Sequence, residues 1–204
     1  EKFNDITERS LTRICREVAT ERDLLNLHGT FYELPAENAD GFAKIRPVSS
    51  HNRAIYDYAS YRGLLVMTGI DADDQTNREH IIRSADGLAK IWAGTIDDLW
   101  KFGKPKGQGG PWKNTKVSNG VASDPYLIGF YDKRSLTLSH DFNKPVVFTI
   151  EVEPIGHGPW MTYQKVTVQP GKSHEHYFPA GFQARWIRFS TDRDCKATAW
   201  LKYE

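Results

Sequence analysis

Cysteine is nearly absent from this sequence: only Cys15 and Cys195 occur among 204 residues, and they lie near opposite ends. Two cysteines so far apart match no metal-ligand spacing and no CxxC motif, which excludes the usual zinc modules and dithiol redox centres. Two interpretations remain. The thiols form a disulfide that joins the two ends of the sequence, or they are independent and partly buried, which is the simpler interpretation.

The sequence also lacks an excess of charge of one sign and a long apolar run. Its 27 basic and 26 acidic residues give a formal net charge of +1, so no overall field favours nucleic acid or an anionic membrane. No apolar stretch approaches the roughly 20 residues of a membrane span, and no signal peptide opens the sequence. Because residue 1 is glutamate rather than methionine, we expect a processed or excised start. We predict no nucleic-acid partner and no membrane span.

Familiar motifs of cofactor and metal sites are missing as well. There is no phosphate-binding loop, no nucleophile elbow and no Rossmann glycine pattern. His174 and His176 alternate by two and could share one side of a strand, but neither they nor His157 have a third ligand at a diagnostic spacing. Asp124, in an Asp-Pro turn, either caps the turn or offers oxygen ligands to calcium. We predict no metal site and no cofactor, with calcium as the alternative.

Aromatic residues and short strand-like runs are abundant. Aromatic residues make up 12% of the chain, with six tryptophans, which suits β-sheet packing, stacking on sugars, or both. Apolar and polar residues alternate from Val146 to Val152, as in a half-buried antiparallel strand. Such runs recur at intervals of roughly 8 to 12 residues, which predicts an all-β sandwich or barrel. The predicted strands cover residues 24–34 (with a bend or bulge at a central glycine), 42–46, 54–58, 62–70, 80–83, 88–94, 126–131, 135–139, 146–152, 162–168, 174–178, 184–189 and 197–203.

One stretch, Leu88–Lys113, separates two kinds of β-structure. It begins as a strand and turns at Asp97, and four glycines and two prolines then lie between Trp100 and Trp112. This composition predicts a shaped loop rather than a flexible linker, because glycine allows unusual backbone conformations and indoles need a surface to pack on or a ligand to bind.

This loop supplies the first set of candidate ligand-binding residues. A sugar ring has an apolar face edged by hydroxyls, so a sugar site combines a flat aromatic ring with acids, amides or amines. The candidates are Trp100 and Trp112 as stacking platforms, Asp97, Asp98 and Lys101 as hydroxyl partners, Tyr126 in the next turn, and Lys104, Lys106 and Lys113 for an acidic sugar. In the alternative, the indoles fix the loop to the sandwich, the acids turn the chain and the lysines are simply solvated.

Polar residues on the strand-like segments of the first part form a second set. These are His28, Glu33, Glu37, Arg46, His51, Asp57 and Arg62. Glu33, His51 and Asp57 could perform acid-base catalysis if they converge. Arg46 and Arg62 could bind a uronate carboxylate through paired hydrogen bonds. In the alternative, each is a satisfied buried polar group or part of a solvated strand face, since no spacing here is a catalytic signature.

Two resemblances to known families predict the architecture in more detail. Residues 144–203 resemble the closing strands of galactose-binding-like jelly rolls in the runs PVVFTIEVE, MTYQKVTV, ARWIRFS and CKATAWLKY. Residues 20–204 resemble the C-terminal part of uncharacterised proteins of polysaccharide-degrading bacteria. In that family, LLNLHGTFYELPAENADGFAKIRP and YRGLLVMTGI look like late blades of a β-propeller, and IDDLWKFGKPKGQGGPWK, SDPYLIGFYDK and the jelly-roll strands follow.

These resemblances imply an all-β chain in two parts. Residues 1–80 are expected to form a propeller-blade-like sheet and residues 81–204 a jelly-roll sandwich, with the hydrophilic run at residues 71–79 as the boundary. A propeller needs several blades, and residues 1–85 supply one or two. Either the chain is a fragment of a longer protein, or the first part packs on the jelly roll as an extra sheet.

The function expected from this context is saccharide recognition. The preferred hypothesis is a carbohydrate-recognition or accessory module of an extracellular or periplasmic saccharide-processing protein, with an oligo- or polysaccharide as its partner. The first alternative is a glycoside hydrolase or polysaccharide lyase whose site lies where blade and sandwich meet. The second is a structural domain that completes a β-propeller or mediates assembly, with further β-propeller domains of the same protein as its partners.

Overall fold

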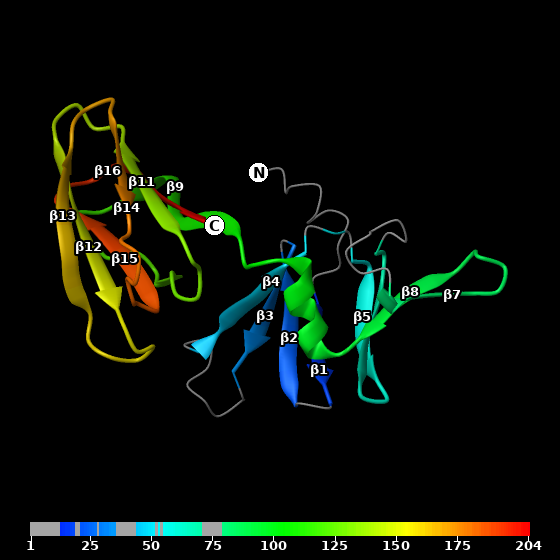
Figure 1. The fold of residues 1–204 in the computed structure, drawn as a ribbon. Helices are drawn as coiled ribbons and strands as arrows, with labels where there is room; N and C mark the ends of the chain where they lie inside the picture. Colours follow the sequence, from blue (N-terminus) through cyan, green and yellow to red (C-terminus); the bar gives the residue numbers. More distant parts are fainter. Residues whose placement is uncertain are drawn as a thin grey trace. The chain divides into compact units, whose positions relative to one another are not determined.

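A computed structural model describes residues 13–18, 21–27, 29–35, 44–51, 53, 55–70 and 79–204. They form an all-β structure that divides into two compact units, Glu1–Pro105 and Lys106–Glu204 (Figure 1). Each unit contains two four-stranded antiparallel sheets. No α-helix occurs in residues 79–204, so the predicted all-β class is confirmed. No helix in the described part of the chain is long and apolar enough to cross a membrane.

The first sheet of the first unit follows the chain strand by strand, as a propeller blade does. It consists of β1 (Arg13–Glu17), β2 (Arg22–Leu27), β3 (Thr30–Leu34) and β4 (Arg46–Ser50), paired in that order. Residues 24–34 were predicted to be one bent strand, which is wrong, because Gly29 adopts a φ of 74° and lets the chain reverse between β2 and β3. Pro47 is tolerated in β4 because β4 is an edge strand.

The second sheet has the order β5-β6-β8-β7. Its strands are β5 (Asp57–Tyr61), β6 (Leu64–Thr68), β7 (Ile81–Arg83) and β8 (Lys90–Gly94). Arg62 and Gly63, with φ values of 49° and 81°, form the two-residue turn between β5 and β6. Alternation predicts opposite faces for consecutive residues of β6, and this is confirmed: Leu65 is fully buried, whereas Leu64 is 40% exposed.

The core of the first unit lies between its two sheets and a 3₁₀ helix, η3 (Ile96–Phe102). Both sheets contribute large buried side chains, and η3 adds three from one face. The buried residues are Leu24, Phe31, Val48, Ile55, Tyr58, Leu65, Met67, Ile70, Trp92, Ile96, Leu99 and Phe102.

The two units divide after Pro105, later than the boundary predicted after residue 80. The reason lies in the strand pairing. Strand β8 pairs with both β6 and β7, so the strands before and after residues 71–79 belong to one sheet and not to two domains. The predicted sandwich therefore begins at β9, not at residue 81.

The second unit is an eight-stranded jelly roll. Its strands are β9 (Gly107–Val117), β10 (Tyr126–Leu127), β11 (Arg134–His140), β12 (Val146–Glu153), β13 (Met161–Val168), β14 (Ser173–Tyr177), β15 (Trp186–Thr191) and β16 (Cys195–Tyr203). They form two sheets in the orders β10-β15-β12-β13 and β14-β11-β16-β9, and every pair is antiparallel. These two orders are the jelly-roll arrangement of a double Greek key. The core between the sheets comes from alternate residues, such as Val146, Phe148 and Ile150 of β12.

The glycine-rich segment before Lys113 is strand β9 and not a loop, so the loop prediction is wrong there. Gly110 lies very close to the backbone of the neighbouring strand β16, and Gly109 lies close to a side chain from the other sheet. A Cβ on Gly110 would lie 2.0 Å from the carbonyl oxygen of Ala199, and one on Gly109 would lie 2.0 Å from the hydroxyl of Tyr126. The register also shifts between Ala199 and Leu201, as at a β-bulge.

Both cysteines are free thiols. Cys15 lies in β1 and Cys195 in β16, so they belong to different units, and each is partly buried. This agrees with the interpretation that they are independent. Burial raises the pKa of the Cys195 thiol, and the nearby Asp141 raises it further, which makes this thiol less reactive.

Candidate functional site

The outer face of the β14-β11-β16-β9 sheet carries the strongest candidate site, which we call the Trp200 face. Leu136, Ala199 and Leu201 point into the core, so the alternate residues of their strands point outward. Strand register places the outward side chains in rows. The Trp200 face consists of Gln108, Lys113, Ser135, Thr137, Ser139, Ser173, Glu175, Tyr177, Thr198, Trp200 and Lys202.

Trp200 is held near the middle of this face. Its indole Nε1–H donates to Gln108 Oε1 at 3.5 Å, from the neighbouring strand β9. The Lys113 ammonium lies 4.7 Å from the centre of the indole ring, in a cation–π contact. The indole remains partly exposed. Two side chains of β9 thus fix the orientation of the ring.

Short hydroxyl side chains surround the indole. Ser135, Thr137 and Ser139 lie on β11 and Thr198 on β16, and all are partly buried. Thr198 Oγ1 accepts a hydrogen bond from the backbone N–H of Asn114 at 3.0 Å. A hydroxyl both donates and accepts, so this part of the face offers paired hydrogen-bonding groups beside an aromatic surface.

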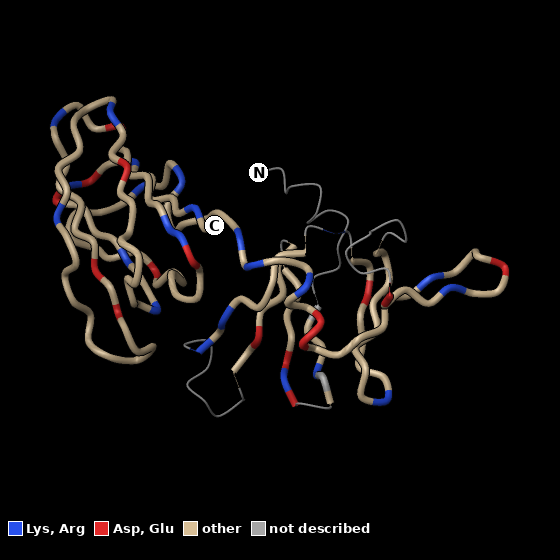
Figure 2. Tube along the Cα trace, viewed as in Figure 1, with Lys and Arg blue, Asp and Glu red and all other residues tan. Residues whose placement is uncertain are grey.

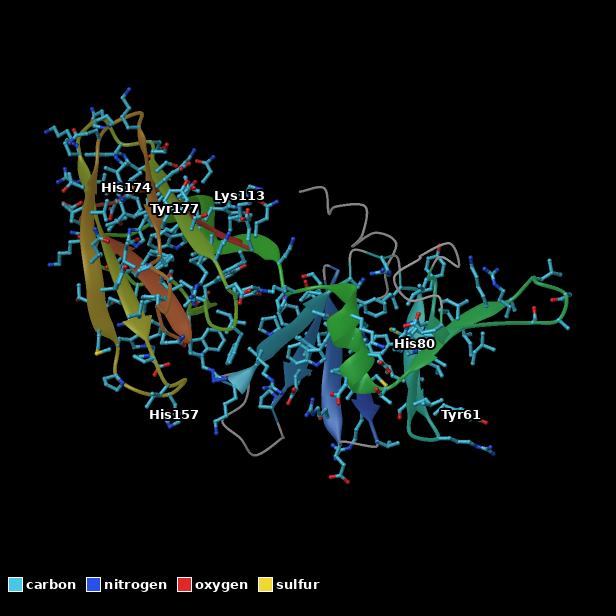
Figure 3. The ribbon with its side chains drawn as sticks, in the orientation of Figure 1. Tyr61, His80, Lys113, His157, His174 and Tyr177 are labelled. Atoms are coloured by element: carbon cyan, nitrogen blue, oxygen red, sulfur yellow. The ribbon has the colours of Figure 1, made fainter. Side chains whose placement is uncertain are left out.

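A second aromatic ring, that of Tyr177 on β14, is 71% exposed. Its hydroxyl donates to Glu175 Oε2 at 3.1 Å, and this hydrogen bond raises the pKa of Tyr177. Tyr177 and Trp200 lie on strands separated only by β11, which corresponds to a lateral distance of about 10 Å. Lys113 and Tyr177 can be located in Figure 3.

The chemistry available on the Trp200 face is that of binding. It combines two aromatic surfaces, several hydroxyls, an amide, a carboxylate and ammonium groups on one face of a sheet. Within the described ranges, no group of three or more His, Cys, Asp or Glu side chains lies close enough together to hold a metal ion.

The two tryptophans predicted as platforms lie in different units and have different environments. Trp112 of β9 is only 6% exposed and packs against Phe189, with ring centres 6.1 Å apart. Its indole holds β9 onto the sandwich core, so it is not a stacking platform. Trp100 of η3 is 59% exposed, beside Lys101 and Asp97 in sequence. Trp100 therefore remains a candidate stacking platform of the first unit, and Trp112 does not.

Asp98 has a structural role at the start of η3. Its Oδ2 accepts hydrogen bonds from the backbone N–H and from the hydroxyl of Thr95, both at 2.8 Å, in a capping box. Lys101 Nζ lies 3.0 Å from its other oxygen. Burial raises the pKa of Asp98, but hydrogen bonds from Thr95 and Lys101 and the nearby His80 outweigh this and lower the pKa to about 2. Its hydrogen-bonding capacity is thus largely used within the protein.

The candidates on the strands of the first unit mostly have structural partners. Arg46 Nε donates to Glu33 Oε2 at 3.0 Å, as a cross-strand pair between β4 and β3. Asp57 Oδ1 accepts from the backbone N–H of Tyr58. Arg62 occupies the turn after β5, with its guanidinium 5.4 Å from the ring centre of Tyr61. His28 and Glu37 lie outside the described residues.

His51 is a buried, hydrogen-bonded histidine. Its Nδ1 accepts from the backbone N–H of Arg53 at 3.0 Å, so its Nε2 carries the proton that is donated to Asn26 Oδ1 at 2.8 Å. Burial and the nearby Arg53 charge lower the pKa of His51 to about 4. A neutral imidazole with both nitrogens engaged stabilises the core and has no nitrogen free to move a proton.

The remaining candidates lie in the second unit. Tyr126 is half-buried with its hydroxyl against Gly109, and Asp124 is exposed in its turn. His174 and His176 share one side of β14, as predicted, because they pair with Leu138 and Leu136. His176 Nε2 lies 3.0 Å from the hydroxyl of Tyr163, while His157 is exposed in a loop.

Sequence reasoning did not single out Trp200, Tyr177 or Gln108. Alternation within residues 197–203 could have indicated that Trp200 faces outward, since Ala199 and Leu201 are typical core residues. Its neighbours could not be predicted, because Gln108 lies 92 residues away in sequence and strand order decides the contact.

Comparisons with known proteins give no family. No protein-family model and no curated protein sequence matches the chain. A protein of the Bacillus endospore appendages, which are disulfide-linked pili, matches 50% of this chain and 89% of its own, with 13% identity and a TM-score of 0.30. The CENP-C cupin domain of Drosophila melanogaster matches 83% of this chain and 84% of its own, with 11% identity and a TM-score of 0.21. The β-fructofuranosidase of Bombyx mori matches 89% of this chain and 54% of its own, with 9% identity and a TM-score of 0.24. These TM-scores are too low to support an argument.

Proposed function

We propose that the chain is a carbohydrate-recognition module in which the Trp200 face binds a saccharide chain. The observation that carries this proposal is the partly exposed indole of Trp200, oriented by Gln108 and Lys113 and surrounded by hydroxyls. A sugar ring stacks its apolar face on an indole, here by displacing the Lys113 ammonium that lies over the ring, while its hydroxyls reach the neighbouring polar groups. The open face of a four-stranded sheet is long enough for an extended polymer, and the exposed ring of Tyr177 offers a further contact.

The context of this function is also a proposal. The resemblance to proteins of polysaccharide-degrading bacteria supports an accessory role in an extracellular or periplasmic saccharide-processing protein. The alternative of a glycoside hydrolase or polysaccharide lyase gains little support, since Glu33 is paired with Arg46 and His51 is buried with both nitrogens engaged.

Binding should be measured by calorimetric titration of the chain with soluble xylan, mixed-linkage β-glucan, galactan and polygalacturonate. Trp200→Ala should weaken the binding of the preferred polymer by about 1–3 kcal/mol, the usual weight of an aromatic anchor. Trp100→Ala is the matched control, an exposed tryptophan of the other unit. Binding by neither the wild type nor any variant would refute the proposal, and loss of affinity only in Trp100→Ala would move the site to the first unit.

A second function, assembly through the first unit, is favoured by the outer face of the β5-β6-β8-β7 sheet. This face exposes Tyr61, Leu64, Ile82 and Ile91. The other face of the same sheet already packs against a four-stranded sheet. A further four-stranded sheet of the propeller kind would cover the open face in the same way.

Sedimentation at increasing protein concentration tests this second function. An open apolar sheet face should cause self-association, which Leu64→Lys should prevent. Leu88→Lys is the control, because Leu88 is also exposed but lies in the turn between β7 and β8. A wild type that stays monomeric at all concentrations would count against assembly through this face.

A further inference from the structure

Two lysines face each other beside the Trp200 face. Lys116 of β9 and Lys196 of β16 are direct partners in the strand register, and both are exposed. Side chains directly opposite in an antiparallel pair lie about 5 Å apart at their Cβ atoms, where like charges destabilise the sheet. Neither ammonium has a salt bridge to any residue that the structure describes. The fold thus keeps two adjacent positive charges together.

Three acidic residues, Asp141, Asp192 and Asp194, lie near Cys195 at this end of β16. Asp192 pairs with Arg193, and Asp194 Oδ1 accepts a hydrogen bond from the backbone N–H of Asn119 at 2.7 Å. Asp141 Oδ1 accepts a hydrogen bond from the backbone N–H of Lys196 at 2.8 Å, so it contacts the main chain of that residue and not its ammonium. At the far end of β16, Glu204 forms a salt bridge with Lys202. Lys202 therefore has a direct ion-pair partner, whereas within the described residues the ammonium groups of Lys116 and Lys196 have none.

The lysine pair lies in line with the indole. The successive outward residues of β16 are Lys196, Thr198, Trp200 and Lys202. Lys113, which belongs to β9, lies over the indole of Trp200. Outward residues of a strand are about 7 Å apart, so the pair lies about 13 Å along the sheet from Trp200. A saccharide chain that stacks on Trp200 and runs along β16 reaches the lysine pair within a few sugar units.

We propose that the ligand of the Trp200 face is an anionic saccharide, with a carboxylate or sulfate group bound between Lys116 and Lys196. This inference rests on the proposed carbohydrate-binding function. An anion at this position would add two attractions that offset the repulsion between the two ammonium groups. The preference must be local, because the chain has a net charge of only +1 and Figure 2 shows acidic and basic residues interspersed over both units.

The test compares polymers that differ only in charge. Polygalacturonate is compared with its methyl ester for the carboxylate, and dextran sulfate with dextran of the same length for the sulfate. Wild type should bind at least one anionic polymer about tenfold or more tightly than its neutral counterpart. Binding should weaken as sodium chloride is raised, because salt screens exposed charges. The carboxylate and sulfate arms show which anion is recognised.

Matched variants assign the preference to the lysine pair. Lys116→Gln combined with Lys196→Gln should abolish the preference, and the corresponding pair of arginine substitutions should retain it. Lys165→Gln combined with Lys172→Gln removes the same charge from β13 and the turn after it, and should change the affinity less than about twofold. Removing the lysine pair should not lower the melting temperature, since it relieves repulsion.

The outcomes separate this inference from the proposed function. Equal binding of charged and neutral polymers by wild type, with loss in Trp200→Ala, would refute the anion preference and leave carbohydrate binding in place. An anion preference that survives the double glutamine variant would refute the role of this lysine pair. Absence of binding to these four polymers and to xylan, mixed-linkage β-glucan and galactan would refute both the anion preference and the carbohydrate-binding function.

Discussion

The two units are each built from two four-stranded antiparallel sheets, but they use buried polar groups differently. In the first unit such groups meet in the core: His51 bonds to Asn26, and the Tyr58 hydroxyl accepts from the backbone N–H of Asn26. In the second unit, buried polar side chains also bond to the backbone of loops that follow strands. Glu153, for example, accepts from the backbone N–H groups of Ile155, Gly156 and Gly158.

The difference has consequences for stability. A polar network in a core is stabilising only when every member is satisfied. In the first unit, Asn26 Nδ2, Ser49 Oγ and Trp92 Nε1 are buried with no hydrogen-bond partner among the described residues. The core of the jelly roll consists of apolar side chains from alternate strand positions, and its buried Arg134 and His140 bond to the backbone carbonyl oxygens of Phe182 and Val168. We therefore expect the second unit to depend on packing and the first to depend on protonation as well.

The largest expected effect tests packing in the second unit. Trp112→Ala should destabilise it by about 3–5 kcal/mol, because a buried indole leaves a cavity against Phe189. Amide hydrogen exchange resolved by peptide should show the loss in β9–β16 and not in β1–β8. Equal loss of protection throughout would show that the two units unfold together, and the comparison between them would fail.

The second prediction tests protonation in the first unit. The folded unit keeps His51 neutral down to about pH 4, whereas the unfolded chain binds a proton at the ordinary pKa of 6.5. Protons therefore favour the unfolded state between these values, and the first unit should lose about 3 kcal/mol as the pH falls from 6.5 to 4.

This loss should appear in hydrogen exchange of β1–β6, corrected for the intrinsic effect of pH. His51→Gln, which cannot titrate, should remove the pH dependence in this window. A wild-type profile that stays flat from pH 6.5 to pH 4 would contradict the buried, neutral state of His51. Asp98, with its pKa of about 2, should contribute only below about pH 4, where its protonation removes the cap of η3.

The third prediction concerns the close approach of β9 and β16. Gly110→Ala should cost about 1–3 kcal/mol, because the new methyl group would overlap the Ala199 carbonyl oxygen and the strands must separate. Gly107→Ala, in the same strand with open space around it, is the control and should be nearly neutral. Thermal melts compare the two. Equal melting temperatures would show that β9 can shift without cost.

The smallest effect is expected at Trp100. Its side chain is mostly exposed on η3, so Trp100→Ala should change the stability of the first unit by no more than about 0.5 kcal/mol. The same thermal melts measure it. A loss as large as that of Trp112→Ala would show that Trp100 is covered in solution.

Much of the fold could be predicted because strands have a local signature. Alternation and turn spacing indicated the strands from β10 to β16 to within a few residues. Strand β9 was missed because glycine and proline normally end strands, and the reason for Gly110 is the close approach of strand β16. Patterns in the local sequence do not show which strand will lie close to a given glycine.

The candidate site was less predictable than the fold. Asp98, Trp112 and His51 are residue types common in binding sites, but their contacts are with the protein itself. The Trp200 face depends on which strands are neighbours, and strand order follows from the jelly-roll topology. Sequence patterns could show that Trp200 points outward, but not that β9 supplies its partners.

The position of β16 also bears on how the protein folds during synthesis. This strand lies between β11 and β9 in its sheet, and it pairs with β9 about 90 residues earlier in the chain. Neither neighbour can complete its pairing until β16 has left the ribosome, so the jelly roll must form late and through long-range contacts, which fold slowly. The first unit, with its first sheet paired strand by strand, can form while the second is still being made.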